Sequence, residues 1–155
     1  MKKKILLDID VVAVAEHFTK DNDHPIAKPF IERVKTGEFE NYTTYALLDL
    51  VEKWKDERIA KKVLNIYRTY TYIIPASEIE LKGRERKIVF EKLVEKIFKR
   101  DVKEEDGALA IIASLFRLTL VTLNRKHLRN KRSEINEILK REGLDEINIV
   151  LPNEV

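Results

Sequence analysis

The segment Ile5-Leu6-Leu7-Asp8-Ile9-Asp10 decides how the rest of the sequence is interpreted. Residues 5–9 form a strand-like run that is apolar except for Asp8, and the basic residues 1–4 before it suit a solvated lead-in. This pattern favours a buried strand that ends among carboxylates. An ionised aspartate in such a setting is costly without a partner, so this strand end is a candidate functional site.

Apolar runs typical of strands alternate with runs at helical spacing along the whole chain. Strands are predicted at residues 5–9, 39–43, 72–75, 118–123 and 147–151. Helices are predicted at residues 11–18, 26–35, 43–54, 59–70, from 77 onward, and at 89–98, 108–113 and 134–141. Thr43 or Thr44 is the expected cap of the third helix, and acidic residues 104–106 precede the helix at 108–113. The helix from residue 77 is expected to begin with a capping-box-like pattern and to break near Gly83. The alternation predicts an α/β three-layer sandwich whose mostly parallel central sheet is flanked by helices. No linker or repeat interrupts it, so we expect one domain over residues 1–155.

The amino-acid composition excludes some classes of protein and some kinds of site. Hydrophobic residues make up 44% of the 155 residues, which is enough for a globular core, and the absence of cysteine excludes disulfides, thiolate zinc sites and cysteine nucleophiles. Charged residues reach 37%, which leans towards the ion-pair-rich surface of a thermophile's protein, and the net charge of +3 permits contact with nucleic acid. The longest apolar run, residues 108–116, is too short to span a membrane. We therefore expect no membrane association and a cytoplasmic protein.

Four short polar segments accompany the predicted strands and helices. They are residues 6–10, 43–49, 105–107 and 122–124. The ends of adjacent parallel strands are close in space even when they are distant in the chain. Carboxylates gathered there repel one another unless a cation neutralises them. The pattern therefore predicts a Mg²⁺- or Mn²⁺-dependent phosphodiesterase site.

The order of these segments resembles that of a PIN domain, the fold of VapC-type toxin ribonucleases. The resemblance covers nearly the whole chain and rests on Asp8-Ile9-Asp10-Val11, on residues 43–50 with Asp49, on residues 106–113, and on residues 120–128. In the family's pattern the first motif is Asp-Thr-Asn-Val, the second acid is usually Glu, and an Arg is common where Leu123 stands. Asp10, Asp49 and Leu123 are therefore departures from that pattern.

The resemblance implies that Asp8, Asp49 and Asp106 are the metal ligands and that Asn124 completes the catalytic set. Each of the four residues also has a structural interpretation. Asp8 suits an Asx turn at a strand end, Asp49 suits a polar position on a helix, and Asp106 or Asn124 suits a helix cap. Supporting roles around the metal are expected for three further residues, Asp10, Thr122 and Glu52, where Glu52 lies one helical turn after Asp49.

A basic run follows Asn124. Arg125, Lys126 and Arg129 are candidate contacts to RNA phosphates, with Lys131 and Arg132 nearby. A solvated charged face is the alternative, and in so lysine-rich a chain it is the default interpretation.

The leading hypothesis is a metal-dependent endoribonuclease with Mg²⁺ or Mn²⁺ as cofactor. The resemblance implies products with 5′-phosphate and 3′-hydroxyl ends, a homodimer and, for a toxin, a small antitoxin protein whose tail blocks the acidic groove. Two alternatives stay open. One is a degenerate PIN domain that binds RNA or protein without catalysis, and the other is a housekeeping nuclease for RNA maturation.

Overall fold

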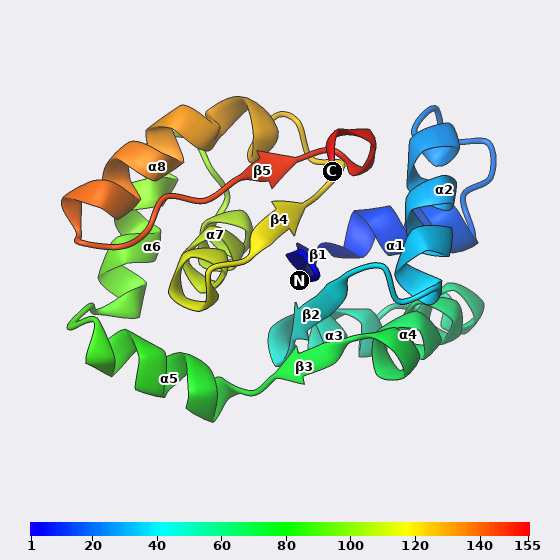
Figure 1. Ribbon diagram of the computed structural model, residues 1–155, viewed down its shortest axis with the longest axis horizontal. Coiled ribbons are helices and arrows are strands. Elements are labelled where there is room, and N and C mark those ends of the chain that lie inside the picture. Colours follow the sequence, from blue (N-terminus) through cyan, green and yellow to red (C-terminus); the bar gives the residue numbers. More distant parts are fainter.

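The computed structural model describes residues 1–155, which fold around one five-stranded parallel sheet (Figure 1). The strands are β1 (Lys4–Leu7), β2 (Glu40–Thr44), β3 (Tyr72–Ile74), β4 (Thr119–Val121) and β5 (Ile149–Val150). The α-helices are α1 (Ile9–Glu16), α2 (His24–Lys35), α3 (Tyr45–Glu52), α4 (Glu57–Tyr70), α5 (Ala76–Glu85), α6 (Phe90–Phe98), α7 (Glu104–Phe116) and α8 (Arg132–Arg141). Two 3-10 helices, Arg129–Lys131 and Pro152–Glu154, precede α8 and follow β5. The predicted three-layer α/β sandwich is confirmed.

The order of strands across the sheet is β3-β2-β1-β4-β5, and every neighbouring pair is parallel. The chain moves outward from β1 through β2 to β3, and then continues on the other side of β1 with β4 and β5. The direction of strand order therefore changes between β1 and β4. Ligands of open α/β sheets bind outside the carboxyl ends of the strands at such a change.

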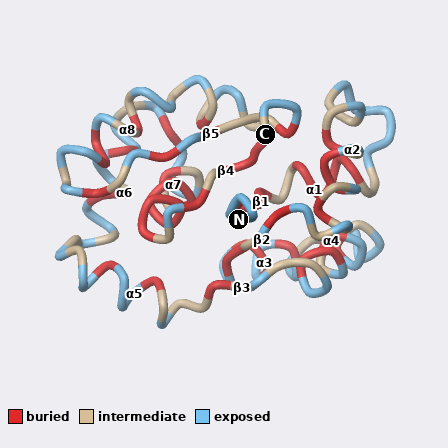
Figure 2. The backbone as a smooth tube through the Cα atoms, viewed as in Figure 1, coloured by how far each residue is buried: buried red, intermediate tan, exposed pale blue.

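Alternate residues of the central strands point to opposite faces of the sheet and contribute to two separate hydrophobic cores. Leu6 and Leu120 join a cluster with α5, α6, α7 and α8, whereas Ile5, Leu7 and Val121 join a cluster with α1, α2 and α4. Figure 2 shows the buried residues concentrated along the inner sides of these two helical layers. Because the central strands are covered on both faces, they lack the polar alternation of a half-exposed strand.

Several predicted boundaries are wrong by a few residues. The first strand ends at Leu7 because Asp8 caps α1, so Ile9 is helical. The α3 helix ends at Glu52 rather than residue 54, and α5 runs through Gly83 without a break. The α5 helix also starts at Ala76 with no side-chain cap, so the expected capping box at Ser77 is absent.

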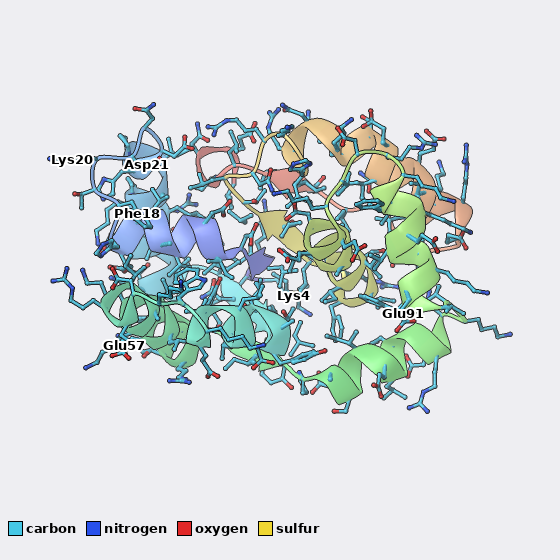
Figure 3. All side chains as sticks on the ribbon, turned by 180° about the vertical axis from the view of Figure 1, so that it is seen from behind. Lys4, Phe18, Lys20, Asp21, Glu57 and Glu91 are labelled. Carbon is cyan, nitrogen blue, oxygen red and sulfur yellow. The ribbon has the colours of Figure 1, made fainter.

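The view from behind (Figure 3) shows how charged side chains cover the outer surfaces. Lys4 marks the start of β1 in the middle of the sheet, and Phe18, Lys20 and Asp21 lie at the far end of the α1–α2 layer. Glu16 of α1 forms ion pairs with Lys28 and Lys35 of α2. None of the helices combines the length and the apolar character that crossing a bilayer requires.

Candidate functional site

Asp8 directly follows β1, beside the residue that follows the neighbouring strand β4. Leu7 pairs with Val121 in the sheet, so the next residue of each strand, Asp8 and Thr122, also lie side by side. Thr122 Oγ1 donates to Asp8 Oδ2 (2.8 Å), and Ile9 N–H donates to Asp8 Oδ1 (2.8 Å). Burial, aided by the charge of Asp106, raises the pKa of Asp8 to about 6 although these two hydrogen bonds oppose it.

Asp10 projects from the first turn of α1 towards the segment that follows β4. Its Oδ1 accepts from Leu123 N–H (3.2 Å), and Thr122 Oγ1 lies 3.4 Å from its Oδ2. Burial and the nearby Asp8 carboxylate raise the pKa of Asp10 well above its ordinary value. Asp10 therefore ties the end of β4 to the beginning of α1.

Asp106 joins the same group of residues from α7. Asn124 Nδ2 donates to Asp106 Oδ2 (3.0 Å), and the Asn124 N–H donates to Thr122 Oγ1 (3.0 Å). Burial raises the pKa of Asp106, while His127 and the Asn124 hydrogen bond act in the opposite direction. The electrostatic influence of Asp106 on both Asp8 and Asp10 places three carboxylates in one local field.

Asp49 and Glu52 lie elsewhere, on α3. Asp49 is exposed and lines an apolar cavity of about 320 Å³ between α3 and α7, together with Glu105. Glu52 pairs with Arg68 of α4 (2.9 Å) on the surface. The structure thus brings together Asp8, Asp10, Asp106, Thr122 and Asn124 but shows no contact between them and the two acids of α3.

The basic run after Asn124 is largely engaged with carboxylates of its own chain. Arg125 makes a bidentate pair with Asp23 (2.9 Å for both contacts), which lowers the pKa of Asp23. Arg129 makes a similar pair with Glu154, lowering the pKa of Glu154 to about 2. Lys126 is exposed and forms no ion pair.

His127, which the sequence analysis included only as part of the family motif over residues 120–128, adjoins this network. Its backbone N–H donates to Asn124 Oδ1 (3.0 Å), and its Nδ1 lies 3.1 Å from the carbonyl oxygen of Asp101. Because a carbonyl oxygen only accepts, Nδ1 carries the proton in this contact. The position of His127, three residues after Asn124, is the feature of the sequence that could have indicated its contact with Asn124.

The chemistry of the donor set fits a hard divalent cation. Carboxylate and amide oxygens are the ligands preferred by Mg²⁺ and Mn²⁺, and a cation would offset the cost of burying charge, and the smaller repulsion between carboxylates, that raise the pKa values of Asp8 and Asp10. As they stand, no three acidic or imidazole side chains converge as a complete metal site. Asp8, Asp106 and Asn124 are the residues available to begin one.

Comparisons with known proteins bear on the fold. No family model and no curated protein matches the sequence. Thirteen chains of solved structures do match the structure. One belongs to the crystal structure of VapBC2 from Rickettsia felis bound to a DNA fragment from their promoter, with a TM-score of 0.55 and 14% sequence identity over 95% of this chain and 97% of that one. At that identity the likeness shows the fold, which is that of a PIN-like α/β sandwich.

Proposed function

We propose that the protein is a metal-dependent endoribonuclease that hydrolyses RNA phosphodiester bonds. One observation carries the proposal: three carboxylates, Asp8, Asp10 and Asp106, are linked through Thr122, Leu123 and Asn124 where the strand order changes, and burial raises the pKa of each. Acids with strongly perturbed pKa values are typical of functional sites. The PIN-like fold supports a nuclease among the activities that such a site can serve.

Asp8 and Asp106 would hold Mg²⁺ or Mn²⁺, with Asn124 acting directly or through water. The bound ion supplies a water activated for attack on phosphorus and charge compensation at the leaving oxygen. The chain's own residues set the geometry. Thr122 and the start of α1 orient Asp8, Asn124 orients Asp106, and Asp10 holds the segment that carries Asn124.

Asp49 remains part of the proposal as a third ligand supplied by α3, with Glu52 beside it. Its exposure and its distance from the hydrogen-bonded network make it the element most in need of a test. Asp49→Asn is therefore compared directly with Asp8→Asn. An equal loss of metal affinity would include Asp49 in the site, whereas unchanged affinity would remove it.

RNA is the proposed substrate, and Lys126 is the proposed phosphate contact because Arg125 and Arg129 already pair with Asp23 and Glu154. The VapBC2 neighbour is a complex, which supports an antitoxin partner for this chain and a role as the toxin of such a pair. A homodimer is proposed as the assembly from the family resemblance alone. The absence of a ready-made cluster of three metal ligands favours, as the second candidate, a non-catalytic RNA- or protein-binding module. A housekeeping RNA-maturation nuclease is the third, and the absence of growth arrest on expression would favour it over a toxin.

The test is cleavage of a panel of labelled RNAs with Mn²⁺, with EDTA, and with Asp8→Asn. We expect cleavage with Mn²⁺ that EDTA and the substitution both abolish. Asp8→Asn is the right replacement because asparagine retains an oxygen that accepts from Ile9 and so preserves the cap of α1. RNA binding that ignores metal, without any cleavage, would support the binding module instead.

A further inference from the structure

The peptide group between Leu7 and Asp8 is held from both sides. Its N–H, which belongs to Asp8, donates to the carbonyl of Val121 in β4 (3.1 Å). Its carbonyl, which belongs to Leu7, accepts from the Tyr67 hydroxyl at 2.9 Å. The first bond continues the sheet, but the second comes from a side chain of α4, sixty residues away in the sequence.

Tyr67 is suited to this contact by its position on α4. Ala60, Val63, Ile66 and Tyr67 form the buried stripe of that helix, and Tyr67 has no exposed surface. A buried hydroxyl without a partner is destabilising, so a phenylalanine would serve better if packing were the only requirement. The hydroxyl is instead directed at the last carbonyl of β1, immediately before the candidate metal ligand.

The surroundings of the phenol keep it a donor. Burial, followed by the charges of Asp8 and Asp10, raises the pKa of Tyr67 well above its ordinary value, so the proton stays on the oxygen. Thr43 of β2 also lies near the phenol, and its buried hydroxyl forms no hydrogen bond. Tyr67 therefore lies at the junction of α4, β1 and β2, directly behind the carboxylates.

We propose that Tyr67 is a positioning residue for Asp8: its hydroxyl fixes the Leu7–Asp8 peptide plane and thereby the direction in which the Asp8 carboxylate points. The proposal rests on the proposed function for its effect on metal and RNA, but its effect on the peptide plane does not. Residues that orient metal ligands through hydrogen bonds influence affinity and rate without touching the metal.

The test begins with Tyr67→Phe, which removes the hydroxyl and keeps the ring. We expect faster hydrogen exchange at the Asp8 amide, Mn²⁺ affinity lower by roughly tenfold in calorimetry, and kcat for RNA cleavage lower by a similar factor with KM nearly unchanged. Replacing Tyr67 with 4-aminophenylalanine, which retains a donor at the same place, should restore all three.

Two matched controls come from the same helix. Tyr70→Phe removes a phenol hydroxyl that forms no hydrogen bond in the structure, and Ile66→Val trims the buried stripe. Both should leave the Mn²⁺ affinity unchanged, and neither should speed exchange at the Asp8 amide more than at the other β1 amides, although Ile66→Val lowers the unfolding temperature and with it the protection of all core amides. If Tyr67→Phe behaves like Ile66→Val, with lower stability alone, the positioning role is wrong.

The outcomes separate this inference from the proposed function. A wild-type protein that neither binds Mn²⁺ nor cleaves RNA would overturn the proposed function, and the Asp8 amide would then decide the inference alone. Faster exchange at that amide in Tyr67→Phe, reversed by 4-aminophenylalanine, would support it. Unchanged exchange would overturn it, whatever the activity.

Discussion

The candidate acids form two groups, which differ in burial and in hydrogen bonding. On the β4 side, Asp8, Asp10 and Asp106 are at least partly buried and linked by hydrogen bonds to Thr122, Leu123 or Asn124. On the α3 side, Asp49 and Glu52 are exposed, and Glu52 forms a surface ion pair. Both groups include residues that the resemblance implied as metal ligands, although Asp49 departs from the family pattern in which that acid is usually Glu. The difference teaches that residue type selects candidates, whereas burial and partners decide which carboxylates have an altered pKa.

The largest expected effect comes from removing a charge on the β4 side. Asp8→Asn or Asp106→Asn should lower kcat for RNA cleavage by more than roughly 100-fold, because even residues that only support a metal ligand contribute up to that factor. Asp49→Asn should cost less. Single-turnover kinetics with Mn²⁺ measures the cleavage rate of all three variants. An equal loss of rate in Asp49→Asn and Asp8→Asn would contradict the expected difference between the two groups of acids.

Stability against pH provides the second test. The pKa of Asp8 is raised to about 6 in the folded protein, so the native state retains its proton when the unfolded chain has already lost it near its ordinary value. Metal-free stability should therefore fall as pH rises from about 4 to 6, by roughly 3 kcal/mol for this group alone. Mn²⁺ should restore more stability at neutral pH than at pH 4. Urea unfolding across this range, with Asp8→Asn as the control, should show a smaller fall in the variant, because the raised pKa values of Asp10 and Asp106 still contribute to it.

Asp10→Asn is expected to stabilise the metal-free protein by a few degrees at neutral pH. Asparagine can still accept from the Leu123 N–H, but it removes the charge whose burial beside Asp8 raises the pKa of Asp10. Calorimetric unfolding at pH 7.5 measures the change. The same substitution at Asp49 should have almost no effect, and equal shifts would contradict the different burial of the two sites.

The smallest effects are expected at the basic run. Lys126→Ala should weaken RNA binding several-fold and reduce the salt slope of the affinity by about one contact. Asp23→Asn should strengthen binding slightly, because it frees Arg125 from its bidentate pair. Fluorescence anisotropy at several salt concentrations measures both. Weaker RNA binding by Asp23→Asn would show that the Arg125–Asp23 pair holds Arg125 in place for RNA instead of keeping it from RNA.

The sequence was sufficient for the architecture because alternating strand and helix periods persist along the chain. It also predicted the meeting of Asp8, Thr122 and Asn124, since parallel strands place their ends together. It could not place Asp49, because the rotation of α3 is set by the burial of Leu47 in one core and of Leu48 and Val51 in the other. It could not assign Tyr67 either, since the contact with Leu7 depends on how α4 docks.

The double role of Asp8 has a consequence for divergent descendants of this chain. The same side chain that accepts a hydrogen bond from Thr122 also caps α1, a short helix in which most residues are buried. A lineage that lost catalysis would still be selected to keep Asp, Asn, Ser or Thr there, because those residues cap helices. Asp106 does not cap α7, so selection for folding protects it less. Its retention in a related sequence would therefore be better evidence of an active enzyme than retention of Asp8.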